Sequence, residues 1–269
     1  MLVSVIIPTY QPGQYLFQCI QSITAQTLDP EAFEIIIVLN GCNEPYRSQI
    51  MTHLKKNERW NTMLLQTDEP GVSNARNRGL DAASGEYICF IDDDDWISPN
   101  FLSNLTDTAH GADIVEANVK QINDYTHLQT PHFLTAAYDR NRTKSNPRLW
   151  DQRSFLSNAC CKIIHKRAIA DDRFAPQFPL GEDSLFMFLI SRRIRTIRIA
   201  SPDTIYYVRQ HPDSASRSGI RYRKKAQLLL QLTAAYIRIW IRRPGQYNFV
   251  FFLTRIAATL QKLFIRNYR

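Results

Sequence analysis

The stretch GEYICFIDDDDWISP, from Gly85 to Pro99, joins a short apolar run to four consecutive acidic residues. Tyr87 to Ile91 is apolar throughout, which is typical of a strand covered on both faces of a parallel sheet. Carboxylates about 5 Å apart repel each other by roughly 3 kcal/mol per pair near a protein surface, so four in a row predict a balancing partner. A divalent cation that prefers oxygen ligands is the simplest partner. A solvated acidic turn that precedes a helix at Pro99 is the alternative.

The same alternation of short apolar strand and helix runs through the first hundred residues. Four runs are predicted to be strands: Val3 to Ile7, Glu34 to Leu39, Thr62 to Gln66 and Glu86 to Ile91. Between them, Leu16, Ile20 and Ile23 have helical spacing, and the segment from Ser73 to Ala83 is compatible with a helix. The order predicts an α/β fold with a mostly parallel sheet flanked by helices. Turn-forming loops follow all four strands, at the sheet edge where ligands of such folds bind.

Composition indicates a globular protein, and the excess positive charge lies in its C-terminal segment. The chain has 269 residues, of which 44% are hydrophobic and 22% charged, as in ordinary globular proteins. From Ser214 onward there are twelve Lys or Arg and no acidic residue, which leaves 21 basic against 25 acidic residues in the rest. The net charge of +8 therefore belongs to the C-terminal segment. Residues 121 to 150, rich in Asn, Thr, Pro and Arg, are interpreted as a polar excursion between two halves.

Several common sites and signals are not indicated. The sequence has neither a GxGxxG motif after its first strand nor a GxxxxGK[ST] motif, so a dinucleotide fold and a P-loop are not supported. The five cysteines form no CxxC pair, so neither a zinc site nor a disulfide framework is expected. Their pattern instead predicts a reducing compartment. The adjacent Cys160 and Cys161 are expected to be buried packing residues. The N-terminus lacks the features of a signal peptide and is interpreted as a strand.

Five segments in order along the chain resemble the motifs of the family 2 glycosyltransferases with the GT-A fold. They are VSVIIPTY, EIIIVLNG, GVSNARNRGLDAASGEYICFIDDDDWISP, GEDSLF and YYVRQHPDSAS. The resemblance covers roughly residues 3 to 216 and is specific through the combined order and spacing of the motifs. It implies a Rossmann-like catalytic domain over 1–216, with a nucleotide-sugar-binding half at 1–100 and an acceptor-side half at 101–216. Residues 217–269 would form a basic, amphipathic helical tail.

The resemblance implies an activity as well as a fold. The enzyme would move a hexosyl or N-acetylhexosaminyl group from a nucleotide sugar, with UDP the most frequent carrier, to an acceptor hydroxyl. The acceptor would be a glycan or lipid-linked glycan in the synthesis of a bacterial surface polysaccharide. A non-catalytic nucleotide-sugar-binding partner subunit is the alternative. Nucleic acid is not expected as a partner, because nucleotide-binding acids repel a phosphate backbone and no nucleic-acid-binding motif is present.

A first group of residues would bind the donor. By resemblance they are Pro8, Thr9, Tyr10, Asn40, Gly71, Asn74, Arg76, Asp92 and Asp93. Tyr10 would stack on the base, or else plug the sheet edge, and Arg76 would face the diphosphate or ribose, or pair with the acidic cluster. Asn40 stands where the family usually has Asp, which leaves the identity of the base open. Gly71 would allow close approach of the backbone to the nucleotide.

A second group would carry the metal and the chemistry. Asp94 would bind Mn²⁺ or Mg²⁺ with Asp92 on the ribose side, although the register of four consecutive acids can slip by one. Asp183, at the start of an amphipathic helix, resembles the general base, with helix capping as the alternative role. Glu182 would lie on the acceptor side, and Arg209 and His211 would close over the diphosphate, with His211 also a candidate metal ligand. The reaction would be one in-line displacement with inversion at the sugar carbon.

The basic tail has three possible roles. Phe249, Phe252, Ile256, Leu260 and Leu263 fall on one helical face, with Arg255, Lys262 and Arg266 largely elsewhere. The longest stretch without charge has twelve residues, Ala226 to Ile237, against the roughly 20 that span a bilayer. The tail is therefore expected to bind an anionic membrane surface, to pack on the catalytic body, or to join copies of the chain. The first role would place the protein in the cytoplasm at the inner face of the membrane.

Overall fold

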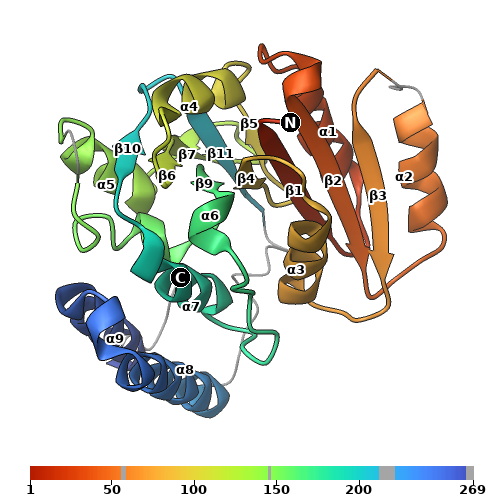
Figure 1. The fold of residues 1–269 in the computed structure, drawn as a ribbon. Coiled ribbons are helices and arrows are strands. Elements are labelled where there is room, and N and C mark those ends of the chain that lie inside the picture. The colour runs from red at the N-terminus through yellow and green to blue at the C-terminus, as the bar shows by residue number, and fades with distance from the viewer. Residues whose placement is uncertain (56–58, 145–146, 212–221, 265–269) are drawn as a thin grey trace.

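A seven-stranded sheet forms the centre of the computed structural model (Figure 1). The structure describes residues 1–55, 59–144, 147–211 and 222–264. The order of its strands is β10-β6-β9-β4-β1-β2-β3. In chain order they are β1 (Val3–Thr9), β2 (Phe33–Asn40), β3 (Thr62–Thr67), β4 (Tyr87–Phe90), β6 (Ile114–Glu116), β9 (Lys162–His165) and β10 (Ile197–Ile199). Only β9 runs antiparallel to its neighbours. The predicted mostly parallel α/β fold is confirmed.

Helices flank this sheet. The longer ones before the tail are α1 (Gln14–Thr24), α2 (Tyr46–Lys55), α3 (Val72–Ala82), α4 (Phe101–Ala109), α5 (Phe133–Asn141) and α7 (Glu182–Ile190). Short turns are η1 (Pro30–Ala32), η2 (Phe155–Ser157), α6 (Lys166–Ile169) and η3 (Ser191–Arg193). Leu16, Ile20 and Ile23 are buried on α1, as their spacing predicts, and α3 packs on β1 and β2.

Burial along the sheet follows the position of each strand. Every residue of β1, β2 and β4 is buried, so these continuous apolar runs are covered on both faces as predicted. Strand β3 is mostly half-buried, because it lies at the edge of the sheet and has only β2 as a neighbour. The parallel β1, β2, β3 and β4 end at one edge. Their loops therefore meet there.

A second sheet lies beside the first and has four strands in the order β5-β11-β7-β8. They are β5 (Trp96–Ile97), β7 (Asn118–Asn123), β8 (Gln129–Thr130) and β11 (Ile205–Gln210). The polar stretch 121–150 is thus more ordered than its composition suggests, since it contains the end of β7, β8 and α5. Helix α5 buries Leu134, Ala137, Tyr138 and Asn141, and the Tyr138 hydroxyl donates to the carbonyl of Ala200 at 2.7 Å.

The tail forms a helical hairpin of α8 (Tyr222–Arg242) and α9 (Phe249–Phe264), joined by η5 (Pro244–Gln246). Its inner side packs on α7 and adds Leu232, Tyr236, Phe251 and Phe252 to the main core. Packing of the tail on the preceding part of the chain, the body of the protein, is one of the three expected roles and is therefore observed. The expected domain boundary between residues 216 and 217 lies outside the described residues, as does Arg266. No helix in the described part of the chain has the length and hydropathy needed to span a bilayer.

The orientation of α9 differs from the sequence-based expectation. Arg255 was expected away from the apolar face, but it is 2% exposed and lies with Phe251 and Thr259 on the side that contacts the body. Phe249, on the apolar stripe predicted from the sequence, is exposed. The spacing of apolar residues alone does not reveal the face of α9 that contacts the body. The central residue of that face is Arg255, a buried arginine that hydrogen-bonds to the body.

Candidate active site

The first and third loops at the carboxyl edge of the sheet are joined by Asn40, the last residue of β2. Its amide nitrogen donates to the carbonyl of Thr9 at 2.7 Å, and its amide oxygen accepts from the backbone N–H of Gly71 at 2.9 Å. Asn40 is 3% exposed, so its contribution is to hold the loop of β1 against the loop before α3. This use of both ends of the amide was not foreseen, and it leaves only a second N–H and a second lone pair for a base.

The other donor-side residues of these loops differ in exposure. Pro8 lies inside β1 and is buried, and Thr9 directs its hydroxyl to Asp93. Tyr10, one residue further, is 54% exposed at the mouth of the loops, which suits an aromatic platform. Asn74 is half-exposed on the first turn of α3 and donates to the carbonyl of Pro70 at 3.1 Å.

Gly71 occupies a backbone conformation that favours glycine. Its φ of +119° lies in the region that side chains rarely adopt, and this turn directs its N–H toward Asn40. A Cβ at this position would meet only the amide of Asn74, at 4.0 Å, so the space beside the Gly71 backbone is open. The open backbone agrees with the expected close approach of a ligand.

Arg76, on α3, joins the two halves of the chain. Its guanidinium bonds Asp92 at 2.9 Å and Asp183 at 2.5 Å, and Asp183 is 107 residues away in sequence. Arg76 is 3% exposed and lies over the rings of Phe90 and Phe174. Burial alone would lower the pKa of Arg76, but the charges of Asp183 and Asp92 outweigh burial and raise it. A permanently charged arginine therefore connects the acidic loop to the predicted base.

The acidic loop between β4 and β5 contains carboxylates in different environments. Asp92 and Asp94 remain partly exposed, whereas Asp95 is buried. Burial raises the pKa of Asp93 to about 7, with the Thr9 hydroxyl opposing the rise and the charges of Asp94 and Asp92 adding to it. Burial likewise raises the pKa of Asp95 well above its ordinary value, with Asp94 and Asp92 adding to it. The loop is thus short of positive charge, as its four acids predict.

Arg209 and His211, at the end of β11, hold this loop from the other side. The Arg209 backbone N–H donates to Asp95 at 2.8 Å, and its Nε donates to the carbonyl of Asp94 at 2.7 Å. The Nε2 of His211 lies 3.0 Å from Oδ2 of Asp94. Asp94 and His211, both predicted, are therefore brought together. The following residues of the YYVRQHPDSAS motif, from Pro212 onward, lie outside the described part of the chain.

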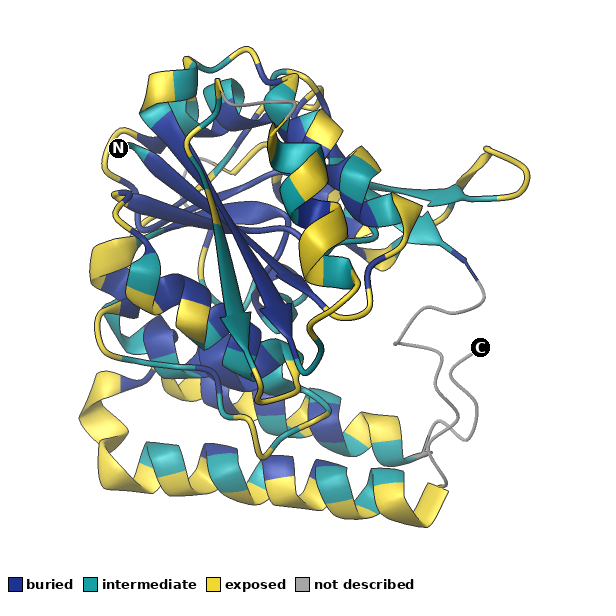
Figure 2. Ribbon diagram, turned by 90° about the vertical axis from the view of Figure 1, so that its right-hand side faces the viewer, coloured by how far each residue is buried: buried dark blue, intermediate teal, exposed yellow. Residues whose placement is uncertain are grey.

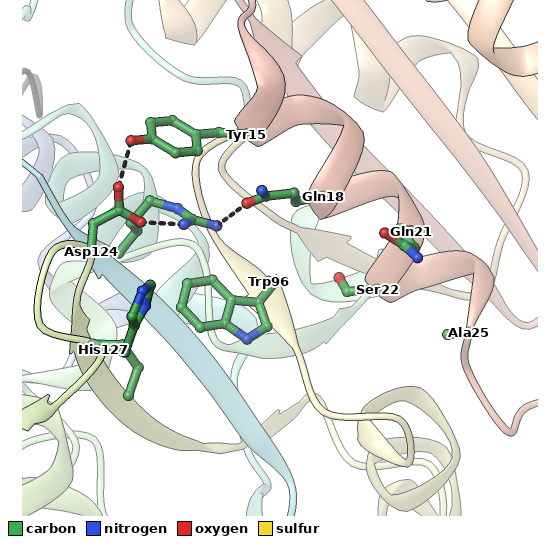
Figure 3. A pocket seen from close by; sticks show the side chains of 10 residues that line it. Tyr15, Gln18, Gln21, Ser22, Ala25, Trp96, Asp124 and His127 are labelled. Atoms are coloured by element: carbon green, nitrogen blue, oxygen red, sulfur yellow. Dashed lines mark hydrogen bonds and ion pairs between the residues drawn. The ribbon is translucent and has the colours of Figure 1, made fainter.

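The end of the Arg209 side chain has partners outside the acidic loop. Its guanidinium bonds Asp124 at 2.5 Å and Gln18 at 2.8 Å, and lies between the rings of Tyr15 and Trp96 (Figure 3). These groups line a hollow of about 560 Å³ between α1 and the second sheet, with Gln21, Ser22, Ala25, Ile122 and His127. Among the predicted site residues only Arg209 lines this hollow. Because Nη1 and Nη2 have these partners, Arg209 contacts the acidic loop through its Nε and its backbone N–H.

Asp183 lies on the first turn of α7 and accepts from two elements. Its Oδ1 accepts from Arg76, and its Oδ2 accepts from the backbone N–H of Ala159 at 3.2 Å. Glu182, beside it, is half-buried, and burial raises its pKa to about 7, with the charge of Asp183 adding and that of Arg76 opposing. Helix α7 therefore begins with two carboxylates in different environments: Glu182, whose pKa burial raises, and Asp183, which accepts from Arg76 and Ala159.

The helical hairpin of the tail braces this turn of α7. Gly181, with φ +82°, precedes Glu182, and a Cβ there would lie 2.5 Å from Cδ2 of Leu232 on α8. The hydroxyl of Ser184 lies 2.6 Å from that of Tyr236, and Arg255 donates to it at 2.9 Å. The tail thus contacts the residues on both sides of Glu182 and Asp183.

Arg255 also reaches the second element that holds Asp183. Its guanidinium donates to the Ser157 hydroxyl at 2.8 Å and to the carbonyl of Arg153 at 2.5 Å, and Ser157 lies two residues before Ala159. Burial lowers the pKa of Arg255 to about 10, with Tyr236 opposing and Arg153 adding to this effect. Its role could not be read from the sequence, where it is one of twelve basic residues in an acid-free tail.

Two further contacts of the site were not predicted from the sequence. The Tyr206 hydroxyl accepts from the backbone N–H of Asp92 at 3.1 Å, and the buried Cys160 lies 4.0 Å from Arg76. Both come from segments whose function depends on how distant parts of the chain pack. Cys160 and Cys161 are buried, as expected, and burial raises the pKa of both thiols.

Comparisons with known proteins all indicate the same protein family. The family model described as glycosyl transferase family 2 matches residues 4–173. The uncharacterized glycosyltransferase EpsJ of Bacillus subtilis is 27% identical over 224 residues, which are 79% of this chain and 62% of that protein. The minor teichoic acid biosynthesis protein GgaB of the same organism is 28% identical over 226 residues, 80% of this chain and 24% of that protein. The chain thus spans less than two thirds of either relative.

The fold also resembles a solved structure. The crystal structure of residues 1–349 of Staphylococcus aureus TarS, in complex with UDP-GlcNAc, superposes with a TM-score of 0.76. The match covers 99% of this chain and 74% of that one, at 20% sequence identity. The expected GT-A type of fold, including the C-terminal helical region, is thereby confirmed.

Proposed function

Because this chain belongs to glycosyl transferase family 2, we propose that it transfers a sugar from a UDP-sugar to an acceptor hydroxyl with inversion at the sugar carbon. The observation that carries the proposal is Arg76, which bonds Asp92 on the donor side and Asp183 on the acceptor side. A donor bound at the sheet edge would have Tyr10 and the Gly71 backbone beside it. The similarity to the UDP-GlcNAc complex of TarS supports UDP as the carrier, and the similarity to GgaB supports a surface polymer as the acceptor.

Asp183 acts as the general base in this proposal. It takes the proton of the acceptor hydroxyl as that oxygen attacks C1 of the sugar, while the bond from C1 to the diphosphate oxygen breaks. Arg76, a fixed positive charge bonded to Asp92, stabilises the negative charge that develops on the departing UDP. The contacts of Asp183 to Arg76 and Ala159 fix its orientation before the acceptor binds.

Asp94 and His211 would hold a divalent cation. Within the described residues no three His, Cys, Asp or Glu side chains are arranged to hold a metal by themselves, so diphosphate oxygens would supply further ligands. The chemistry fits, because the four acids of the loop include the partly exposed Asp94, whose carboxylate can accept a hard cation. A bound Mn²⁺ or Mg²⁺ would offset charge on the diphosphate.

Chelation tests the metal assignment. We expect UDP to raise the melting temperature in the presence of Mn²⁺, this rise to disappear in excess EDTA, and re-addition of Mn²⁺ or Mg²⁺ to restore it. Asp94→Asn should show no such rise while keeping its own melting temperature near that of the wild type. Asp107→Asn, which alters an exposed acid on α4, is the matched control. An undiminished UDP effect in EDTA would remove the metal from the proposal.

Arg255→Met tests whether the tail positions the base. The change removes the bonds to Ser184, Ser157 and the Arg153 carbonyl, so the first turn of α7 should loosen and turnover should fall by on the order of 10 to 100-fold. The affinity for UDP, set by loops on the other side of the site, should change little. Stability should fall by less than the lost bonds suggest, because the desolvation cost of a buried charge also disappears.

The control for this variant is Arg140→Met, which removes an exposed arginine on α5. A positioning role predicts that kcat falls while the KM for donor stays close to the wild-type value, and that Arg255→Lys restores part of kcat. Equal losses in UDP affinity and kcat would instead make Arg255 a residue of general structural importance.

A further inference from the structure

The side of the helical hairpin that faces away from the body carries exposed apolar residues. On α8 they are Leu230, Ile237 and Ile241, whose spacing of i, i+7 and i+11 places them on one helical face. On α9 they are Phe249, Val250 and Leu253, clustered in the first two turns. All six are between 40% and 63% exposed. We call these six residues the outer face of the hairpin.

The two parts of the outer face adjoin at the turn of the hairpin. Trp240, next to Ile241, lies with its ring centroid 5.7 Å from that of Phe249 and 5.1 Å from that of Phe252. Figure 2 shows the hairpin along one end of the molecule, with exposed positions along its side away from the sheet. The hydrophobic residues that bind the hairpin to the body are different ones, among them Leu232, Tyr236 and Phe251. The outer face is therefore exposed, and it is separate from the side of the hairpin that packs on the body.

The charges around the outer face have one sign. Arg223, Lys224, Arg238, Arg242 and Arg243 are exposed on α8 and at its end. No Asp or Glu follows Asp213 anywhere in the sequence. A soluble helix whose outer side meets only water usually mixes both signs of charge and few large apolar residues. The composition of this side thus fits a partner that is both negatively charged and apolar.

We propose that the outer face binds the surface of an anionic lipid bilayer. The six apolar side chains would enter the boundary between headgroups and acyl chains, and the arginines would contact lipid phosphates. Each Lys or Arg near such a surface contributes about 1 kcal/mol. A second copy of the chain fits less well, because a symmetric pair would bring two acid-free basic surfaces together. The surface shares only Phe249 with the α9 stripe expected from sequence, whose other residues are buried or half-buried.

Co-sedimentation of the full chain with vesicles tests this proposal. We expect binding at low salt to vesicles of phosphatidylcholine and phosphatidylglycerol in equal parts, release at high salt, and weak binding to phosphatidylcholine alone. The double variant Ile237→Ser, Leu253→Ser should bind the anionic vesicles at least about tenfold less tightly, because two apolar side chains no longer enter the lipid. Its melting temperature and UDP response should match the wild type, since both residues are exposed.

The matched control is Leu128→Ser, which removes an apolar residue of comparable exposure at the end of the β7–β8 connection. It should bind vesicles like the wild type. Two results would overturn the proposal: failure of the full chain to bind anionic vesicles, or equal binding by the double variant and the control. Light scattering on the same samples distinguishes self-association, since a dimer that the double variant dissociates, without vesicle binding, would assign the outer face to a second copy.

Discussion

Asp183→Asn is expected to lower turnover by on the order of 10² to 10⁴-fold while the affinity for UDP remains near that of the wild type. The amide oxygen can still accept from Arg76, so the link between the halves of the chain persists. The amide nitrogen cannot take a proton from an acceptor, and it cannot accept from the Ala159 N–H as Oδ2 does. Initial rates of UDP release with an active donor and acceptor, together with calorimetric titration of UDP, measure the two quantities separately.

Glu182→Gln is the matched control for Asp183→Asn, because it changes the adjacent carboxylate on the same turn. The elevated pKa of Glu182, about 7, makes it the alternative base. If the roles proposed above hold, Glu182→Gln reduces turnover much less than Asp183→Asn does. Loss of activity in Glu182→Gln with activity retained in Asp183→Asn would exchange their roles. A loss of UDP binding in Asp183→Asn would make Asp183 a structural or donor-side residue.

Arg76→Met is expected to lower both the stability of the fold and the affinity for UDP. Removing one partner of a buried ion pair typically costs 3–5 kcal/mol, and because Asp92 and Asp183 keep some exposure we expect about 3 kcal/mol. The methionine fills much of the volume between Phe90 and Phe174, so the loss arises mainly from the two carboxylates left without a counter-charge. Urea denaturation monitored by circular dichroism measures the change in the free energy of unfolding.

Arg78→Met provides the control on the same helix. Arg78 is exposed two residues beyond Arg76, and its replacement should change the free energy of unfolding by no more than about 0.5 kcal/mol. UDP affinity should also be unchanged. Equal stability of the two variants, with normal UDP binding in both, would show that the link made by Arg76 contributes neither to folding nor to the donor site.

The sequence predicts the sheet edge well, because the information is local. Continuous apolar runs give β1, β2 and β4, and acids or turn residues directly after them give the loops that meet at this edge. The edge position of β3 is a property of strand order, which periodicity does not encode, so its partial exposure was not foreseen. The strand and helix within 121–150 were not predicted, because the apolar residues of α5 form one short cluster in a mostly polar stretch.

The partners of the site residues were harder to predict than the residues themselves. Arg76 and Asp183 were both candidates, but nothing local indicates that residues 107 positions apart form an ion pair. Arg209 was predicted to close over the diphosphate, and its contacts to the acidic loop, Asp124 and Gln18 were not predicted. Arg255 illustrates the limit most clearly. Its burial depends on three hydroxyl and carbonyl acceptors from two distant segments, residues 153–157 and the first turn of α7.

The contacts of Gly181 and Ser184 with the helical hairpin have a consequence for building chimeric enzymes. Recombining related transferases to exchange acceptor preference invites a joint near residue 217, where the resemblance to the catalytic motifs ends. Such a joint would place a foreign hairpin against α7, and a bulkier residue at Leu232 or a different one at Arg255 would then displace the turn that carries Asp183. The acceptor-side half and the hairpin should therefore come from the same parent enzyme. A productive crossover therefore lies upstream of Arg153, so that the hairpin travels with every segment it touches.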